Sequence, residues 1–558
     1  MTFHVEQQLN LTYMTTFSIT GYLVDIAGRT SRPSRVTVQD GRIHRIEPVD
    51  KPDREIYIVP GLVDSHIHIE SSMLSPQQFA RVAVTHGTTA TVSDPHEITN
   101  VLGEEGLEYM VESGRQVPLK FHFGVPSCVP ATPFETSGAV LDGEKVERLI
   151  QDNRFFYLAE MMNFPGVVGG DPDVMRKLQA AARAGKPVDG HAPGVRGEDL
   201  KKYAAAGIST DHECSTYEEA LEKIDQGMKI QIREGSAARD FDALAPLIDE
   251  YPDRVMLCSD DRHPDDLLEG HIDALIRKGL SRGLDFYHLL QAATINPVSH
   301  YGLSSGLLRE GDPADMVLID HPDTFRVQEV YIDGSMVFDG KDALFEVSDE
   351  SAPNIMQAGD VPLEDLRVRA ESERVRVIHA RDHELYTSSS IERLNTDGGW
   401  LHASTGSDVL KVVVLNRYQP QKPAVAFIHG FGLQWGAIGT SIAHDSHNLI
   451  AVGVDDRSLQ ELLNHLIRIR GGIAVYDQEK MHSLTLEIGG LMTHQPAGTV
   501  SEHYAYLTGK ARSLGCKLEA PFMTLSFMAL PVIPELKITD RGLFDVGAFA
   551  YTSLYAAQ

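Results

Sequence analysis

The middle of the chain alternates strand-like and helix-like segments, and this alternation constrains the fold more than any other feature. Residues 59–308 hold eight short apolar runs separated by longer amphipathic stretches. The expected strands are GLVDSHIHIE, TTATVSDPHE, LKFHFGVPS, FFYLAEMMNF, KPVDGHAPG, GISTDHEC, MKIQIREGS and VMLCSDDRHP. Expected helices such as SPQQFARVAVTHG, PDVMRKLQAAARAG and GEDLKKYAAAG end in glycine, a common helix stop. Eight strand–helix units over this length predict an α/β fold built on a (β/α)8 TIM-like barrel.

Two β-rich pieces flank this middle section. Residues 18–58 carry short extended runs around an Asp-Gly turn, and residues 309–344 have the same texture in PADMVLIDHP and RVQEVYIDGSMVFDG. We expect the two flanks to combine into one small β domain. After residue 345 strand-like runs mix with glycine-rich turns and helices, which predicts a separate C-terminal α+β domain over residues 345–558.

Composition and charge exclude several classes of partner. The 558 residues include 79 acidic and 50 basic side chains, a formal net charge of −29. Such a surface repels phosphate backbones and anionic lipids, so neither nucleic acid nor membrane is expected as a partner. No apolar run is long enough to span a bilayer, and the first residues lack a signal-peptide pattern. Four scattered cysteines without a C-x-x-C pair argue against disulfides and thiolate zinc sites, and a cytoplasmic location fits best.

Polar side chains gather at the C-terminal ends of the expected strands, where chemistry takes place in a barrel. His66 and His68 are two residues apart in DSHIHIE, so a strand directs both to one face. This pair alone is weak evidence, because 24 histidines give about one His-x-His by chance. Later strands end with Glu160, His191, His212 and Asp260. Six imidazoles and carboxylates on one rim predict a pair of divalent ions, and without thiolates Mn, Fe and Zn all remain open.

Other polar residues extend this rim. Glu70 follows the metal-site histidines, and Asp94 and His96 end the second strand in SDPHE. Glu70 and His96 are candidate substrate contacts, with support of the ligands as an equally weighted alternative. A third ion near Asp94 and His96 is also left open. The C-terminal AHDSHN motif carries His444, Asp445 and His447. This motif is either a lid that reaches the barrel mouth or a turn built by its own side chains.

These motifs together carry a family resemblance. The runs PGLVDSHIHIESS, VDGHAPG, STDHEC and CSDDRHPDD resemble the amidohydrolase superfamily and, within it, the adenine deaminases. The C-terminal stretches SIAHDSHNLIAVGVDD, LEIGGLM and PFMTLSFMALPVIPELKITDRGLFDV resemble the extra domain of that family. This domain separates the family from dihydroorotases and hydantoinases, which share the barrel. The resemblance covers nearly the whole chain.

The resemblance implies a ligand assignment. Many superfamily members carry a carboxylated lysine after the fourth strand, whereas YLAEMMNF places Glu160 there, in agreement with adenine deaminases. The first ion would be held by His66, His68 and Asp260, and the second by His191 and His212, with Glu160 bridging both. The family is associated with Mn or Fe rather than a strict zinc requirement, and we favour Mn(2+).

The implied reaction is hydrolytic deamination of adenine to hypoxanthine and ammonia, in purine salvage or catabolism. A divalent ion lowers the pKa of bound water to about 7 and supplies the hydroxide. Asp260 is the candidate base that takes the water's proton and passes it on. Glu213 is the candidate that moves a proton to a ring nitrogen, provided the strand has ended before it; a surface salt bridge is the alternative. Asp261 is a candidate acceptor for the purine imidazole N–H, or else supports its neighbours.

Two alternative functions remain. One is another amidohydrolase activity, on a different aminopurine or a cyclic amide, because barrels of this kind host many chemistries. The other is an inactive binding scaffold, which predicts lost ligands although all six candidates are present. We expect a homo-oligomer, most simply a dimer, that acts on a small purine base.

Overall fold

The computed structural model describes residues 16–556 apart from 237, 349–351 and 383. One seven-stranded sheet, in the order β16-β15-β14-β4-β1-β2-β3, draws strands from both ends of the central segment. Its members are β1 (Thr16–Asp25), β2 (Thr30–Gln39), β3 (Arg42–Pro48), β4 (Tyr57–Pro60), β14 (Met316–Ile319), β15 (Val327–Ile332) and β16 (Ser335–Phe338). The join is the antiparallel pair β4–β14. This sheet has a small hydrophobic core of its own, which includes Val36, Ile43 and Ile58.

Each of the eight segments expected to form a central strand contains at least one strand. They are β5 (Leu62–His68), β6 (Thr88–Ser93), β7 (Lys120–Phe123), β8 (Leu158–Met161), β9 (Val188–Gly190), β10 (Thr210–Asp211), β11 (Lys229–Arg233) and β12 (Val255–Cys258). Parallel pairing joins β5–β6–β7, β8–β9 and β10–β11–β12. The short strand β13 (Asp260–Asp261) follows β12 and pairs with β5, so the last expected strand returns beside the first.

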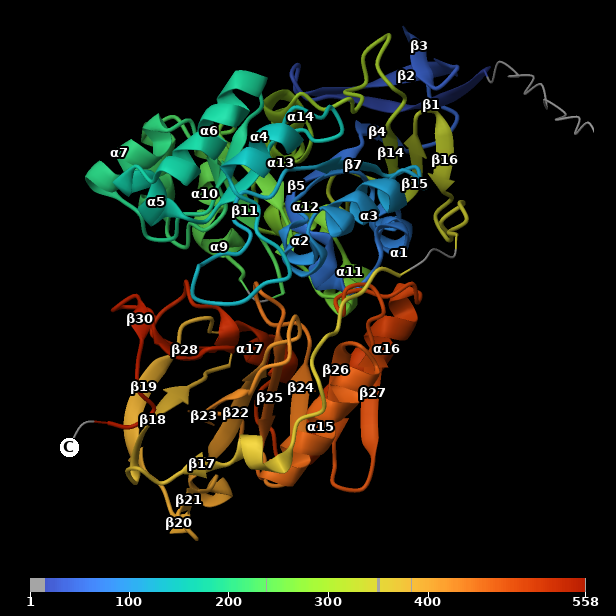
Figure 1. The fold of residues 1–558 in the computed structure, drawn as a ribbon. Coiled ribbons are helices and arrows are strands. Elements are labelled where there is room, and N and C mark those ends of the chain that lie inside the picture. The colour runs from blue at the N-terminus through green and yellow to red at the C-terminus, as the bar shows by residue number, and fades with distance from the viewer. Residues whose placement is uncertain (1–15, 237, 349–351, 383, 557–558) are drawn as a thin grey trace, which may run out of the picture.

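Helices separate these strands and surround them (Figure 1). They are α1 (Pro76–Ala83), α2 (His96–Leu102), α3 (Glu104–Gly114), α4 (Gly143–Leu149), α5 (Phe164–Gly169), α6 (Pro172–Ala184), α7 (Gly197–Ala205), α8 (Tyr217–Asp225), α9 (Phe241–Leu244), α10 (Pro246–Glu250), α11 (Pro264–Glu269), α12 (Ile272–Ser281), α13 (Phe286–Ala293) and α14 (Ile295–Tyr301). The sequence signals explain α6: the Asp171 side chain accepts hydrogen bonds from the Asp173 and Val174 N–H groups, and Gly185 ends the helix with φ 65°. The helix expected at PDVMRKLQAAARAG is therefore confirmed.

The C-terminal region forms an eight-stranded sheet in the order β19-β18-β23-β22-β25-β24-β26-β27. Its strands are β18 (Arg374–His379), β19 (Ser388–Arg393), β22 (Val409–Leu415), β23 (Ala424–His429), β24 (Ala437–Thr440), β25 (Leu449–Gly453), β26 (Gly472–Tyr476) and β27 (Met481–Thr485). The accompanying helices are α15 (Asp456–Arg468), α16 (Ala497–Ser513) and α17 (Pro521–Ser526). A buried leucine stripe on α15, including Leu459 and Leu463, packs into the same core cluster as Leu449 of β25. Within the described residues, no helix is long and apolar enough to cross a membrane.

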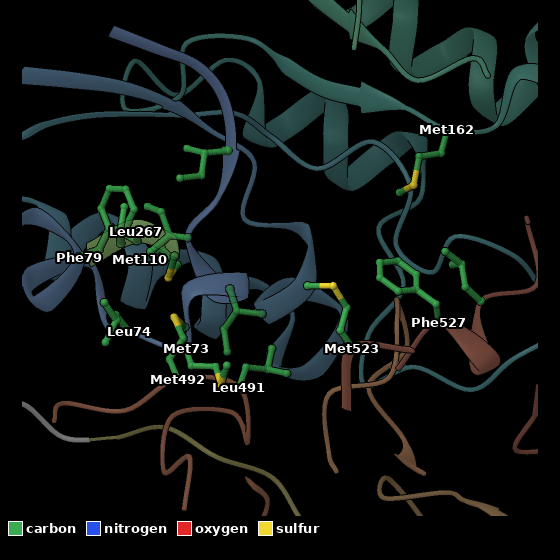
Figure 2. Close-up of a cluster of buried hydrophobic side chains, with 14 of the residues drawn as sticks. Met73, Leu74, Phe79, Met110, Met162, Leu267, Leu491, Met492, Met523 and Phe527 are labelled. Carbon is green, nitrogen blue, oxygen red and sulfur yellow. The ribbon is translucent and has the colours of Figure 1, made fainter. Parts of the chain in front are cut away.

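The C-terminal region packs against the end of the central segment at which β5 finishes (Figure 1). The Thr493 N–H donates to the Met73 carbonyl at 2.9 Å, and the Ser75 N–H donates back to the Thr493 carbonyl at 3.0 Å. Figure 2 shows the apolar side chains at this junction, with Met73 beside Leu491 and Met492. The strand ends that carry the candidate site residues are therefore covered by the C-terminal region.

Candidate metal centre and catalytic pocket

All six side chains predicted as metal ligands lie together at the strand ends. They are His66 and His68 on β5, Glu160 on β8, His191 after β9, His212 after β10 and Asp260 on β13. Glu160 lies at the centre of the group: its Oε1 is 3.3 Å from His68 Nε2, and its Oε2 is 3.1 Å from His212 Nε2. The same Oε2 is 2.7 Å from His191 Nδ1. Asp260 Oδ1 lies 3.4 Å from His68 Nε2 and 3.8 Å from His66 Nε2. This arrangement fits a carboxylate that bridges two groups of ligands.

Several buried histidine nitrogens of this cluster have no hydrogen-bond partner in the part of the chain that the structure describes, and this bears on whether the cluster fits a cation. Both ring nitrogens of His66 lack a hydrogen-bond partner among the described residues, and so does His212 Nδ1. Burial, together with the neighbouring His212, holds the pKa of His66 well below its usual range, so its imidazole is neutral. A neutral imidazole offers a lone pair, and an unsatisfied buried polar group costs about 1–3 kcal/mol. The donor set therefore fits a divalent cation, with nitrogen and oxygen ligands only.

Asp94 and His96 extend the ligand cluster. His96 Nδ1 lies 3.5 Å from Glu160 Oε1 and 3.4 Å from Asp94 Oδ2. Together with His68 these residues form a buried group whose ligand atoms all lie within 4.8 Å of one another. His96 is thus placed among the candidate ligands, and the substrate contact predicted for it stays a prediction.

Glu213 lies beyond the end of its strand, since β10 ends at Asp211. This is the condition that the sequence argument set for a role at the site. Glu213 does form a salt bridge, but a buried one, with Arg233. Burial alone would raise the pKa of Glu213; the Arg233 guanidinium and neighbouring histidines outweigh burial and lower it. Glu213 is therefore an ionised carboxylate in the wall of the pocket.

The sequence analysis missed Arg233, the last residue of β11. Its Nη1 donates to Asp260 Oδ2 at 2.8 Å, its Nη2 to Glu213 Oε2 at 3.0 Å, and its Nε to Asp240 Oδ2 at 2.8 Å. One guanidinium therefore holds both residues predicted to carry out the proton transfers. A charged residue at the end of the apolar run KIQIR, on the same rim, was the available signal.

Asp261 and Glu70 occupy different positions relative to the pocket. Asp261 lines it, and its Oδ1 accepts a hydrogen bond from Ser71 Oγ at 2.6 Å. Glu70 lies outside the lining, and its Oε1 accepts from the Ile98 N–H in α2 at 3.1 Å. Glu70 therefore supports the start of α2, and its predicted substrate contact is not favoured by this placement.

The C-terminal region closes the pocket from the other side. Its lining includes Leu385, His444, Asp445, Phe527, Leu530, Val532 and Ile533. His444 Nδ1 lies 3.0 Å from Glu97 Oε1 of α2, and its ring stacks on Phe527 with the centroids 4.5 Å apart. The AHDSHN motif thus reaches the mouth of the central segment, as one of its two interpretations required.

Comparisons with known proteins agree over nearly the whole length of the chain. Residues 57–337 match the amidohydrolase family, and residues 384–550 match the adenine deaminase C-terminal domain. The adenine deaminase of Methanosarcina mazei is 52% identical, with 96% of this chain and 99% of that protein covered. The adenine deaminase of Salinibacter ruber is also 52% identical, with coverage of 97% and 99%. Among solved structures, a β-aspartyl dipeptidase from Fervidobacterium islandicum has a TM-score of 0.45 at 17% identity, covering 59% of this chain and 100% of that one. The chain belongs to the adenine deaminase family, within the amidohydrolases.

Proposed function

We propose that this protein hydrolyses adenine to hypoxanthine and ammonia in a metal-dependent reaction. One observation carries the proposal: the buried ligand cluster around Glu160 adjoins the Glu213–Arg233–Asp260 group in one pocket. Family membership identifies the substrate, because relatives that are 52% identical over nearly the full chain are adenine deaminases.

The ligand assignment proposed for this site uses two ions, with Mn(2+) favoured over Fe(2+) and Zn(2+). Each ion would take neutral imidazoles and carboxylate oxygens: His66, His68 and Asp260 for one, His191 and His212 for the other, and Glu160 for both. A divalent ion held there would supply water with a pKa lowered to about 7. The side chains of the pocket supply the rest of the chemistry.

Proton transfer is assigned to the two carboxylates that share Arg233. Asp260 would take up the proton of the attacking water and deliver it to the leaving ammonia. Glu213 is ionised before reaction, so it would accept the second proton of the attacking water and pass it to a ring nitrogen. Arg233 keeps both carboxylates in place, since it donates to Asp260 Oδ2 and Glu213 Oε2 from one planar group. Asp261 remains a proposed substrate contact.

The wider setting is also proposed. The central strands form a (β/α)8 barrel over residues 59–308, the two flanks form a small β domain, and residues 345–558 form the third domain. The enzyme acts in the cytoplasm as a homodimer in purine salvage or catabolism, and all four cysteines are free thiols. Turnover of another aminopurine or a cyclic amide is the alternative activity.

The test is ammonia release by purified protein reconstituted with Mn(2+). Adenine is the substrate, and adenosine, guanine and cytosine are the controls. We expect turnover of adenine alone, with loss of activity on chelation and in Glu160→Ala. The exposed Glu198→Ala is the matched control and should keep full activity, since Glu198 lies at the surface in a salt bridge with Lys201. A metal-loaded protein that is silent toward adenine would overturn the proposal.

A further inference from the structure

Asp445 carries an unpartnered carboxylate oxygen in the wall of the pocket. The residue lies in the AHDSHN motif, is only 5% exposed, and lines the same pocket as Glu160. Its Oδ2 is buried and has no hydrogen-bond partner among the residues that the structure describes. Such an oxygen costs folding free energy unless a ligand or water satisfies it. The position therefore points to a donor that arrives with the substrate.

The other carboxylates of the pocket are already engaged. Glu160 and Asp260 face the histidine cluster, and Glu213 pairs with Arg233. Glu97 pairs with His444, and Asp261 Oδ1 accepts from Ser71. Among the described lining residues, Asp445 Oδ2 is the one buried carboxylate oxygen with no hydrogen-bond partner.

The surroundings of Asp445 suit a flat aromatic ring. Phe527, Leu530, Val532 and Ile533 of the C-terminal region line the pocket, and Met162 lines it from the central segment. Figure 2 labels Met162 on the central segment and Phe527 on the C-terminal region, and both line this pocket. Apolar walls with a few placed polar groups are the usual form of a small-molecule site. A heterocycle held between these walls needs an acceptor for each of its N–H groups.

We propose that Asp445, rather than Asp261 with its Oδ1 bonded to Ser71, accepts a hydrogen bond from the imidazole N–H of a free purine base and so selects the base against its nucleosides. The inference rests on the proposed function. A free purine carries an N–H on its five-membered ring, whereas a nucleoside has a bond to the sugar in place of an N–H. A nucleoside would leave the Asp445 oxygen unpaired and would press its sugar against the apolar wall. Sites built around one hydrogen bond reject analogues that lack it by large factors.

The test measures steady-state kinetics with adenine in the Mn-reconstituted Asp445→Leu and Asp445→Asn variants. Leu is close in size and has no acceptor, so KM should rise about 10-fold or more while kcat stays within about 3-fold. Asn keeps one acceptor oxygen, so its rise in KM should be smaller. Both variants should retain the wild-type metal content and should discriminate less against 9-methyladenine, which lacks this N–H.

The control is Asp408→Asn in the same region. Asp408 accepts hydrogen bonds from the Gly430 and Gly432 N–H groups and lies outside the pocket lining, so its variant should lose stability and keep the wild-type KM. Unchanged KM in both Asp445 variants, or loss of metal from them, would overturn the proposal for Asp445 alone. A wild-type enzyme that ignores adenine would overturn the proposed function and this inference with it.

Discussion

Removal of the Arg233 guanidinium is expected to lower both stability and catalysis. The residue is 6% exposed, and its guanidinium pairs with three carboxylates, those of Glu213, Asp260 and Asp240. Removing one partner of a buried ion pair lowers the free energy of unfolding by about 3–5 kcal/mol. Arg233→Met leaves three carboxylates without their cation, so its loss should lie at the upper end of that range. The freed carboxylates also repel one another. A displacement of about 1 Å in a catalytic group lowers the rate roughly 100-fold, so kcat/KM should fall by at least that factor.

The assay combines urea unfolding with adenine turnover, at matched metal content. Arg233→Lys keeps the charge but cannot fork between two carboxylates, so it should lie between wild type and Arg233→Met. Lys411→Met is the control, because Lys411 of β22 is a buried cation paired with Asp456 of α15 and lies outside the pocket lining. It should lose stability and keep kcat/KM. The reasoning is refuted if Arg233→Met retains kcat/KM within about 3-fold, or if Lys411→Met loses as much activity.

Three further outcomes follow from burial and packing. Burial lowers the pKa of His122 to about 4 despite its hydrogen bond to the Thr91 carbonyl. Between pH 6.5 and 4 the His122 imidazole therefore takes up a proton in the unfolded chain and not in the folded protein. Stability should therefore fall by about 1.4 kcal/mol per pH unit as pH drops through this window, and His122→Leu should flatten the slope in urea unfolding. Gly138→Ala should lower the melting temperature, because its Cβ would lie 1.9 Å from the Val101 carbonyl oxygen, whereas Gly169→Ala, with no atom within 4 Å, should not. Adding Mn(2+) to chelated enzyme should raise the melting temperature. A ligand that binds only the folded state and is present at about 100 times its Kd adds about 2.7 kcal/mol to the free energy of unfolding. An unchanged melting temperature would contradict a metal site in the folded protein.

Local patterns were enough to predict the elements and the ligand candidates. A strand directs residues i and i+2 to one face, which places His66 and His68 together before any tertiary contact is known. Parallel strands end at one edge, so polar residues after successive strands could be expected to meet, and Glu160 and His212 do. Asp171 and Gly185 marked the ends of α6 by their own capping chemistry.

Nonlocal partners explain what the sequence did not reveal. Arg233 looked like an ordinary charge at the end of a strand, and its importance comes from carboxylates on two other segments, Glu213 and Asp260. Glu70 follows the metal-site histidines in the sequence, yet its Oε1 accepts from the Ile98 N–H and the residue lies outside the pocket lining, so its substrate contact stays a prediction. Sequence proximity to a ligand therefore says little about which side of the pocket wall a side chain occupies.

The pocket is complete only when two distant parts of the chain meet, and this has a consequence for specificity. The central segment supplies the candidate ligand cluster and the carboxylates proposed to transfer protons, while the C-terminal region supplies His444, Asp445 and the apolar wall at Phe527. Catalytic power and choice of substrate can therefore change separately. Substitutions at Glu160 or Arg233 act on the reacting groups and should lower kcat, whereas substitutions in the C-terminal wall act on a contact made equally before and during reaction. Such contacts alter KM rather than kcat. The C-terminal wall offers the Asp445 acceptor among apolar side chains, which suits a free base better than a substrate that carries a sugar.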